Sequence, residues 1–275
     1  MNTRTGTLDV PGATLYYEVT GTGPLLLISQ SGDADTRRGG DLTERLAEDH
    51  TVVTYDRRGL SRSTLHEPER PVTIAAHSDD VHRLLAAVTD EPALMLGCSF
   101  GALIGIHLVI DHPEQLDTLV AHEPVAPWLL PDTERVRLEG ELEHLREVHR
   151  RDGTGATMKE VARMLGIDPI AQETEPNLTR HPMTPERDAD FTFFVEHDFG
   201  AVLSDTADVA ALKDGTVRVI PAAGRTTPRT VLDRRCAEEL ASLRGTALAE
   251  FPGGHNGNLT HPGAFAERLR AVLKG

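Results

Sequence analysis

The chain has 275 residues, of which 39% are hydrophobic, a formal net charge of −15 and only two cysteines. This length and apolar content allow one sizeable core, so we expect a single folded unit that carries an insertion. The negative charge repels phosphate backbones and anionic lipid headgroups, which excludes nucleic acid and membrane surfaces from the expected partners.

The first eleven residues lack the apolar core of a signal peptide, and no run of about 18 apolar residues could span a bilayer. We therefore expect the protein in the cytoplasm. Cys98 and Cys236 belong to no CxxC pair, so neither a disulfide framework nor a zinc site is expected.

Short apolar runs alternate with amphipathic segments, which is typical of an α/β fold with a mostly parallel sheet between two layers of helices. Apolar residues at helical spacing mark packing stripes, one within residues 81–88 and another within 231–243. The strands that we expect are residues 13–19, 25–28, 51–55, 93–96, 116–121, 216–222 and 247–251.

The pentapeptide Gly97-Cys98-Ser99-Phe100-Gly101 follows an expected strand and precedes a helix-compatible run. It is a G-x-S-x-G motif in the strand, turn and helix setting of a nucleophile elbow. The glycines leave room for a strained, sharp turn, and the helix start directs N–H groups toward the serine. We predict that Ser99 is a nucleophile and that Cys98 points elsewhere.

The alternation of strands and helices stops at residues 127–205, where helical spacing continues without strands. We expect a helical cap there, inserted into a core formed by residues 1–126 and 206–275. Its phenylalanines either hold the cap on the core or line an apolar substrate pocket. Trp128, Phe191 and Phe194 are the candidate substrate contacts of this segment.

His255 stands in the sequence Phe-Pro-Gly-Gly-His-Asn-Gly, after the last expected strand and before the last expected helix. A histidine on a glycine-flanked loop at this place can reach the elbow and take the proton of a serine. Of the thirteen histidines, only His255 has this setting. We predict that it is the general base.

From end to end the chain resembles an α/β-hydrolase, through the motifs LLLISQSG, YDRRGLSRS, GCSFG, DHPEQLDTLVAHEP and FPGGHNG. The resemblance implies an oxyanion hole formed by the N–H of Phe100 and one from Ser31 or Gly32. Members usually have a His-Gly pair in this loop, where Gln30 and Ser31 stand here. Asp33 in the same loop is either a substrate contact or a turn cap. The turn Asp-Arg-Arg-Gly at residues 56–59 is interpreted as structural.

Members of this family most often carry the triad acid in the turn after the strand at 216–222, but this turn has no Asp or Glu before Asp233. Three explanations are possible. The protein has a catalytic dyad without an acid or is an inactive binding protein, Asp233 is the triad acid, or the acid is a carboxylate that follows the preceding strand. Asp233 falls a turn into the following helix and is poorly placed. Glu123 follows the strand at 116–121, and the order Ser99, Glu123, His255 is that of the fold. We therefore predict Glu123 as the acid, a turn cap being the alternative.

The fungal zearalenone lactonases, a branch of this family, are similar at GCSFG, at the His-Glu-Pro after the next strand, at AAGRTTP and at PGGH. This similarity implies a Ser-His-Glu triad more firmly than it implies a mycotoxin substrate, because the cap differs.

We expect acyl transfer from a hydrophobic ester or lactone to water without any metal or organic cofactor, with a resorcylic macrolactone among the candidate substrates. Epoxide hydrolases and dehalogenases of this fold carry an aspartate where Ser99 stands. A ligand-binding or sensor protein, or a cofactor-free lyase or perhydrolase, has the same motifs, so these alternatives stay open.

Overall fold

The computed structural model describes residues 2–274, which form a nine-stranded sheet. Two of its strands were not expected, β1 (Thr3–Val10) and β5 (Thr64–Leu65). β1 is mostly exposed and lacks an apolar run, and it is held by antiparallel pairing with β2. The seven expected strands are β2 (Ala13–Gly21), β3 (Leu25–Ser29), β4 (Thr51–Tyr55), β6 (Ala93–Cys98), β7 (Leu116–His122), β8 (Arg218–Gly224) and β9 (Ala249–Phe251).

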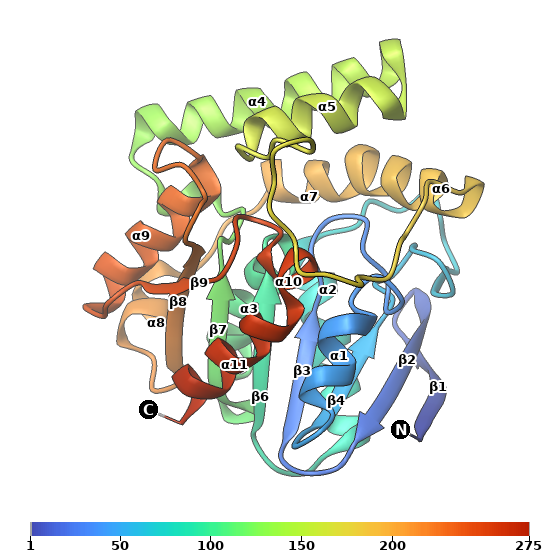
Figure 1. The fold of residues 1–275 in the computed structure, drawn as a ribbon, viewed down its shortest axis with the longest axis vertical. Helices are drawn as coiled ribbons and strands as arrows, with labels where there is room; N and C mark the ends of the chain where they lie inside the picture. Colours follow the sequence, from blue (N-terminus) through green and yellow to red (C-terminus); the bar gives the residue numbers. More distant parts are fainter. Residues whose placement is uncertain (1, 275) are drawn as a thin grey trace.

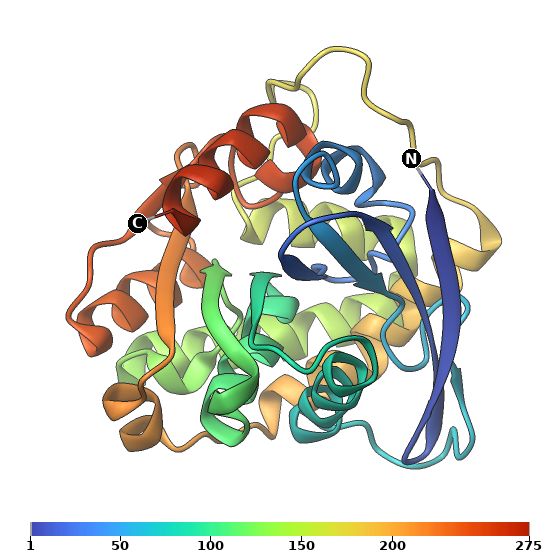
Figure 2. The same ribbon diagram turned by 90° about the horizontal axis from the view of Figure 1, so that it is seen from below.

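The strand order is β1-β2-β4-β3-β6-β7-β8-β9, with β5 paired to β2. β1 and β2 run antiparallel to their neighbours, and every pair from β4 through β9 is parallel. Seen from below, the twisted sheet runs from the blue β1 at one edge to the orange β8 near the other (Figure 2). This mostly parallel sheet confirms the predicted fold class.

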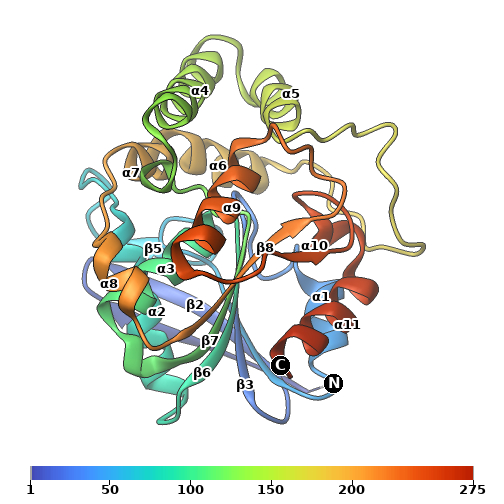
Figure 3. The ribbon, with the colours of Figure 1, turned by 90° about the vertical axis from the view of Figure 1, so that its left-hand side faces the viewer.

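Helices cover both faces of the sheet (Figure 3). On one face α2 (Ile74–Val88), α3 (Phe100–Asp111) and α9 (Leu232–Arg244) share a buried apolar cluster with the strands. On the other face α1 (Gly40–Leu46) and α11 (Pro262–Leu273) form a second cluster. The two predicted stripes of apolar residues belong to the first cluster. Leu84 on α2 and Leu240 on α9, for example, are fully buried in it.

The segment 127–205 consists of helices and an irregular stretch at 165–184, and its helices lie above the sheet in Figure 1, beyond the carboxyl ends of the parallel strands. The buried residues of α4 are Leu138, Leu142, Leu145 and Val148, and their helical spacing places them on one face. The helices of the segment 127–205 are η2 (Pro127–Leu129), α4 (Asp132–Asp152), α5 (Thr154–Met164), α6 (Pro185–Phe193), the π-helical turn η3 (Phe194–Asp198) and α7 (Phe199–Leu203).

Three shorter helical segments complete the chain: η1 (Pro113–Gln115), α8 (Val209–Asp214) and α10 (Gly257–Thr260). Within residues 2–274, no helix is both long and apolar enough to cross a bilayer.

Candidate active site

Ser99 lies at the sharp turn between β6 and α3. Its backbone has φ 51° and ψ −115°, a region that residues with a side chain rarely adopt. Two glycines make this turn possible: a Cβ on Gly97 would lie 2.6 Å from the Cα of Ala102, and one on Gly101 would overlap the carbonyl oxygen of Ser29. The turn thus presents Ser99 at the start of α3, where backbone N–H groups are free to meet an anion.

Glu123 and His255 form a buried hydrogen-bonded pair. Glu123 comes directly after β7, and its Oε2 accepts from Nδ1–H of His255 at 2.7 Å. Its Oε1 accepts from the backbone N–H of Gly224, at the end of β8, at 2.8 Å. The glutamate from one strand earlier therefore occupies the side of the imidazole where a triad acid acts.

The two partners shift each other's proton affinity. Burial raises the pKa of Glu123, but the hydrogen bond and the charge of His255 outweigh burial and hold this pKa at about 2. Burial lowers the pKa of His255, but the hydrogen bond to Glu123 and its charge raise it above the ordinary value. Glu123 therefore stays ionised and stabilises an imidazolium, as the acid of a triad does.

The other ring nitrogen of His255, Nε2, lies 3.8 Å from Oδ2 of Asp233. Asp233 is in the first turn of α9 and is only 2% exposed. It faces Nε2 rather than Nδ1, so it is indeed poorly placed to be the triad acid, yet it lies beside the imidazole. Among residues 2–274 no hydrogen bond joins Ser99 to His255; such bonds often form only when substrate binds.

Both cysteines are buried free thiols. Burial raises the pKa of Cys98 to about 12, and burial also raises that of Cys236. Neither thiol ionises near neutral pH, so neither is a nucleophile, although Cys98 is the neighbour of Ser99.

Arg57 fixes the loop that contains Ser31 and Gly32. Its guanidinium donates to the carbonyl oxygen of Gln30 at 3.2 Å and to that of Gly32. Because the C=O and N–H of a trans peptide unit point in opposite directions, these two bonds also set the directions of the N–H groups that follow each carbonyl, including that of Ser31. The loop expected to supply an oxyanion donor is therefore held by a buried cation.

The same guanidinium ties the loop to the helical insertion. Asp198, at the end of η3, is fully buried and lies 3.2 Å from Arg57 Nη2 and 3.1 Å from His77 Nε2. Arg57 and His77 in turn contact the ring of Phe100, at 4.8 and 5.2 Å from its centre. This cluster could not be predicted from the sequence, because Arg57 stands in a turn with a structural interpretation and no sequence pattern pairs it with Asp198.

Of the predicted substrate contacts, Phe194 lies nearest the elbow. Its ring packs edge-on against Phe100 at 6.0 Å and against Phe199 at 4.7 Å. A Cβ on Gly32 would lie 3.5 Å from the Phe194 ring, so the ring also covers the predicted oxyanion loop. Phe191 is 4% exposed and lies 6.0 Å from the ring of His149, on the side of α4.

Trp128 and Asp33 are already engaged by other side chains. Trp128 Nε1–H donates to Oδ2 of Asp205 at 2.8 Å, and this carboxylate also lies 3.0 Å from Nε2 of His107. Asp33 forms ion pairs with Arg38 and with Arg187 of α6. Asp33 therefore joins the core to the insertion directly, whereas Trp128 does so through Asp205, which reaches His107 of α3.

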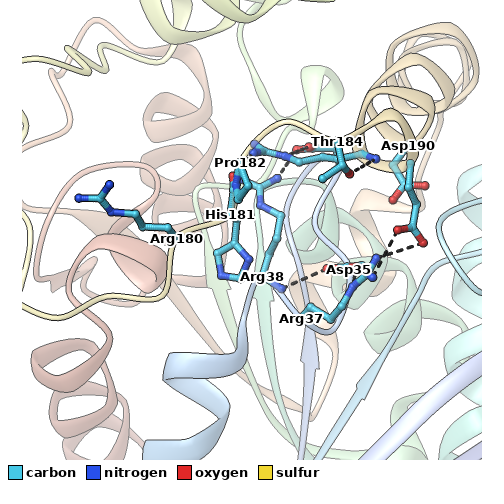
Figure 4. Close-up of a pocket in the computed structure, with 11 residues that line it drawn as sticks. Asp35, Arg37, Arg38, Arg180, His181, Pro182, Thr184 and Asp190 are labelled. Carbon is cyan, nitrogen blue, oxygen red and sulfur yellow. Dashed lines mark hydrogen bonds and ion pairs between the residues drawn. The ribbon is translucent and has the colours of Figure 1, made fainter.

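Two cavities lie between the insertion and the core. The first, of about 190 Å³, is polar: Asp35 binds Arg37, and Asp190 of α6 faces them across the cavity (Figure 4). The second, of about 670 Å³, reaches His255. Its mixed walls come from residues 165–173, from the turn after β8 and from the histidine loop. The second cavity is the one that gives access to the imidazole of His255.

One group of side chains in the described part of the chain brings three potential metal ligands together, namely His82, His112 and Glu114. The two imidazoles are stacked at 3.7 Å with 14° between their planes. In stacked rings the nitrogen lone pairs lie in parallel planes and do not converge on one ion. The group also lies at the other end of α3 from Ser99, so it plays no part in the candidate active site.

The profile of the family described as alpha/beta hydrolase fold matches residues 30–155. A curated relative from Bacillus subtilis (strain 168), described as uncharacterized hydrolase YraK, is 36% identical over 100% of this chain and 97% of the relative.

Among solved structures, the enol-lactonase from Burkholderia xenovorans LB400 superposes with a TM-score of 0.71 at 19% identity, covering 98% of this chain and 100% of that one. The esterase EaEST from Exiguobacterium antarcticum superposes with a TM-score of 0.75 at 18% identity, covering 97% of both chains. At these identities the likeness concerns the fold alone.

Proposed function

The chain belongs to the α/β-hydrolase family and is a hydrolase of that fold, and from this premise we propose that it cleaves a carboxylic ester or a lactone through an acyl-enzyme on Ser99. The observation that carries the proposal is the 2.7 Å hydrogen bond between Glu123 and His255. It is supported by Ser99 at a strained turn, and the two solved structures above bear the names of a lactonase and an esterase.

In the first half of the reaction, Nε2 of His255 takes the hydroxyl proton of Ser99 while Oγ attacks the substrate carbonyl carbon. The negative charge that forms on the carbonyl oxygen is stabilised by the N–H of Phe100 and by one from Ser31 or Gly32. Glu123 keeps the imidazole in the tautomer with its proton on Nδ1 and stabilises the imidazolium.

In the second half, His255 gives its proton to the leaving alcohol, and the carbon–oxygen bond breaks. A water molecule, deprotonated by the same Nε2, then attacks the acyl-enzyme; the bond to Ser99 Oγ breaks, Nε2 returns the proton to Oγ, and the acid is released. In a lactone the alcohol remains tethered to the acyl group, so the product is one ring-opened hydroxy acid.

The substrate class that we propose is a hydrophobic ester, with resorcylic macrolactones of the zearalenone type as the specific candidates. The apolar ring of Phe194, packed beside Phe100 and Gly32, favours an apolar acyl portion. The four motifs shared with the zearalenone lactonases support the macrolactone. We further propose residues 127–205 as the cap that selects the substrate.

The test is a turnover panel of aliphatic esters, small lactones and resorcylic macrolactones, combined with fluorophosphonate labelling of the wild-type protein and of Ser99→Ala. We expect labelling at Ser99 and turnover of at least one class, with a loss of about 10⁴-fold or more in Ser99→Ala. Macrolactone turnover at a higher kcat/KM than that of simple esters supports the specific substrate.

A ligand-binding or sensor protein on the same fold gives neither labelling nor a burst of product from a chromogenic ester. That result, obtained with correctly folded protein, contradicts the serine mechanism. Turnover that persists in Ser99→Ala also contradicts it, because the chemistry then uses another nucleophile.

A further inference from the structure

Asp233 lies on the opposite side of the His255 imidazole from Glu123. Glu123 binds Nδ1 at 2.7 Å, whereas Oδ2 of Asp233 lies 3.8 Å from Nε2. Nε2 is the atom that receives the proton of Ser99 in the proposed reaction and returns it to the leaving group. Asp233 is therefore outside the Ser-His-Glu relay but adjacent to the atom that carries the moving proton.

The carboxyl of Asp233 has few other partners. It is 2% exposed, and within residues 2–274 no hydrogen bond reaches it. Its place in the first turn of α9 favours the ionised form through the helix dipole. Burial without a hydrogen bond strongly disfavours that form, so the nearby imidazole has a large influence on where the proton resides.

The charged groups that face Asp233 come from three other elements. Burial raises its pKa, the charge of His255 on the loop after β9 opposes this, and the charges of Glu123 after β7 and Glu141 on α4 raise it further, giving a value of about 7. Arg234, the next residue along α9, directs its guanidinium to backbone carbonyls and to a glutamate on the same helix. Apart from His255, no cation is among the groups that shift the pKa of Asp233.

We propose that Asp233 is a positioning residue for His255, whose carboxylate holds the imidazolium proton at Nε2 and so sets the pH below which the base is blocked. This inference rests on the proposed serine mechanism. While the proton is on Nε2, His255 cannot accept the proton of Ser99. When the proton moves to the Asp233 carboxylate or to water, Nε2 is free and the serine becomes reactive.

The direction of the effect follows from the charges. A neutral residue at position 233 no longer stabilises the imidazolium, so the pKa of His255 falls and Nε2 stays free at lower pH. A single opposite charge at about 4 to 6 Å shifts a pKa by about 1 to 3 units. The acid limb of kcat/KM should therefore move to lower pH by about that amount when the charge of Asp233 is removed.

The experiment compares wild-type protein with Asp233→Asn and with the control Glu239→Gln. Glu239 lies on the same helix, but its carboxylate pairs with Arg235 at 2.7 Å. The first readout is the pH profile of kcat/KM on a neutral ester. The second is the NMR chemical shift of Hε1 of His255, the proton on the ring carbon between the two nitrogens, followed as a function of pH. We expect both to shift to lower pH in Asp233→Asn and neither to shift in Glu239→Gln.

A residue that only stabilises the start of α9 would give a different result: Asp233→Asn would lower the denaturation midpoint and leave both pH readouts in place. That outcome overturns the inference. If Asp233→Asn does not fold, Asp233→Ala, which is neutral and smaller than the aspartate, replaces it in the same comparison.

The NMR titration separates the two proposals. If the wild-type protein neither turns over esters nor labels at Ser99, the proposed function fails, while the titration still reports whether Asp233 holds the imidazolium proton. If the wild-type protein is active and the titration is the same in Asp233→Asn, only the role of Asp233 is refuted.

Discussion

Backbone strain at single residues marks the candidate active site. Among the described residues other than glycine, four have a positive φ, and Ser99 at 51° and Glu123 at 46° are two of them. Such a conformation costs about 1 to 2 kcal/mol per residue, so the surrounding structure must maintain it. The strained backbone conformation of Glu123 is held by the hydrogen bonds that its carboxylate accepts from His255 and from the backbone N–H of Gly224. Both strained residues directly follow a strand at the carboxyl edge of the sheet, where the predicted nucleophile and acid meet.

Replacing Glu123 with Gln tests the acid at the residue scale. The amide has the shape of the carboxylate but no charge, so the imidazolium loses its stabilisation and the ring its preferred tautomer. We expect kcat to fall by about 10⁴-fold with an ester substrate. The exposed Glu114→Gln is the matched control and should retain full activity. Full activity in Glu123→Gln, together with loss of activity in Asp233→Asn, would show that the acid is misassigned.

At the scale of elements, the contact between α6 and η3 of the insertion and the core combines two kinds of ion pair. Asp198 of η3 and Arg57 are both almost fully buried, at 0% and 1% side-chain exposure. Glu186 of α6 and Arg37 are about half exposed, at 51% and 50%. Water and salt screen the second pair, whereas removing one partner of the first leaves an uncompensated charge in the interior.

The two pairs should therefore differ strongly in their effect on stability. We expect Asp198→Ala to lower the free energy of unfolding by about 3 to 5 kcal/mol, and Glu186→Ala, the exposed counterpart, by less than about 1 kcal/mol. Urea denaturation of both variants at neutral pH provides the measurement. Equal and small losses would mean that the buried pair does not hold the insertion on the core.

For the whole molecule the dominant property is the net charge of −15. Most of the arginines near the polar cavity already bind carboxylates, as Arg37 binds Asp35 and Arg38 binds Asp33. An approaching anion therefore meets a negative field, which salt screens over about 10 Å at 0.1 M ionic strength.

Substrate charge should consequently change the salt dependence of the reaction. For a negatively charged ester, we expect kcat/KM to rise about twofold or more as sodium chloride increases from 20 to 200 mM, because screening weakens the repulsion. A neutral ester with the same acyl chain serves as the reference and should change little. A fall in kcat/KM for the anionic ester would instead indicate local attraction by an arginine at the entrance.

The sequence by itself determined the fold class and the position of the elbow, because both depend on local patterns. Apolar runs of strand length, helical stripes such as that of α2, and the glycines around Ser99 each act over a few residues. β1 was missed for the same reason: its polar, exposed sequence forms a strand only by pairing with β2. The placement of Glu123 on His255 was anticipated from chain order and from the motifs shared with known hydrolases.

Only the tertiary structure decided which distant side chains share a buried space. Arg57 and Asp198 are 141 residues apart, and their pairing depends on how the insertion folds back over the sheet. Asp233 was discounted from its position along the chain, yet the start of α9 brings it to the far side of the imidazole. Proton affinity in such a site follows from burial and from charges within a few ångströms, and these distances exist only once the chain is folded.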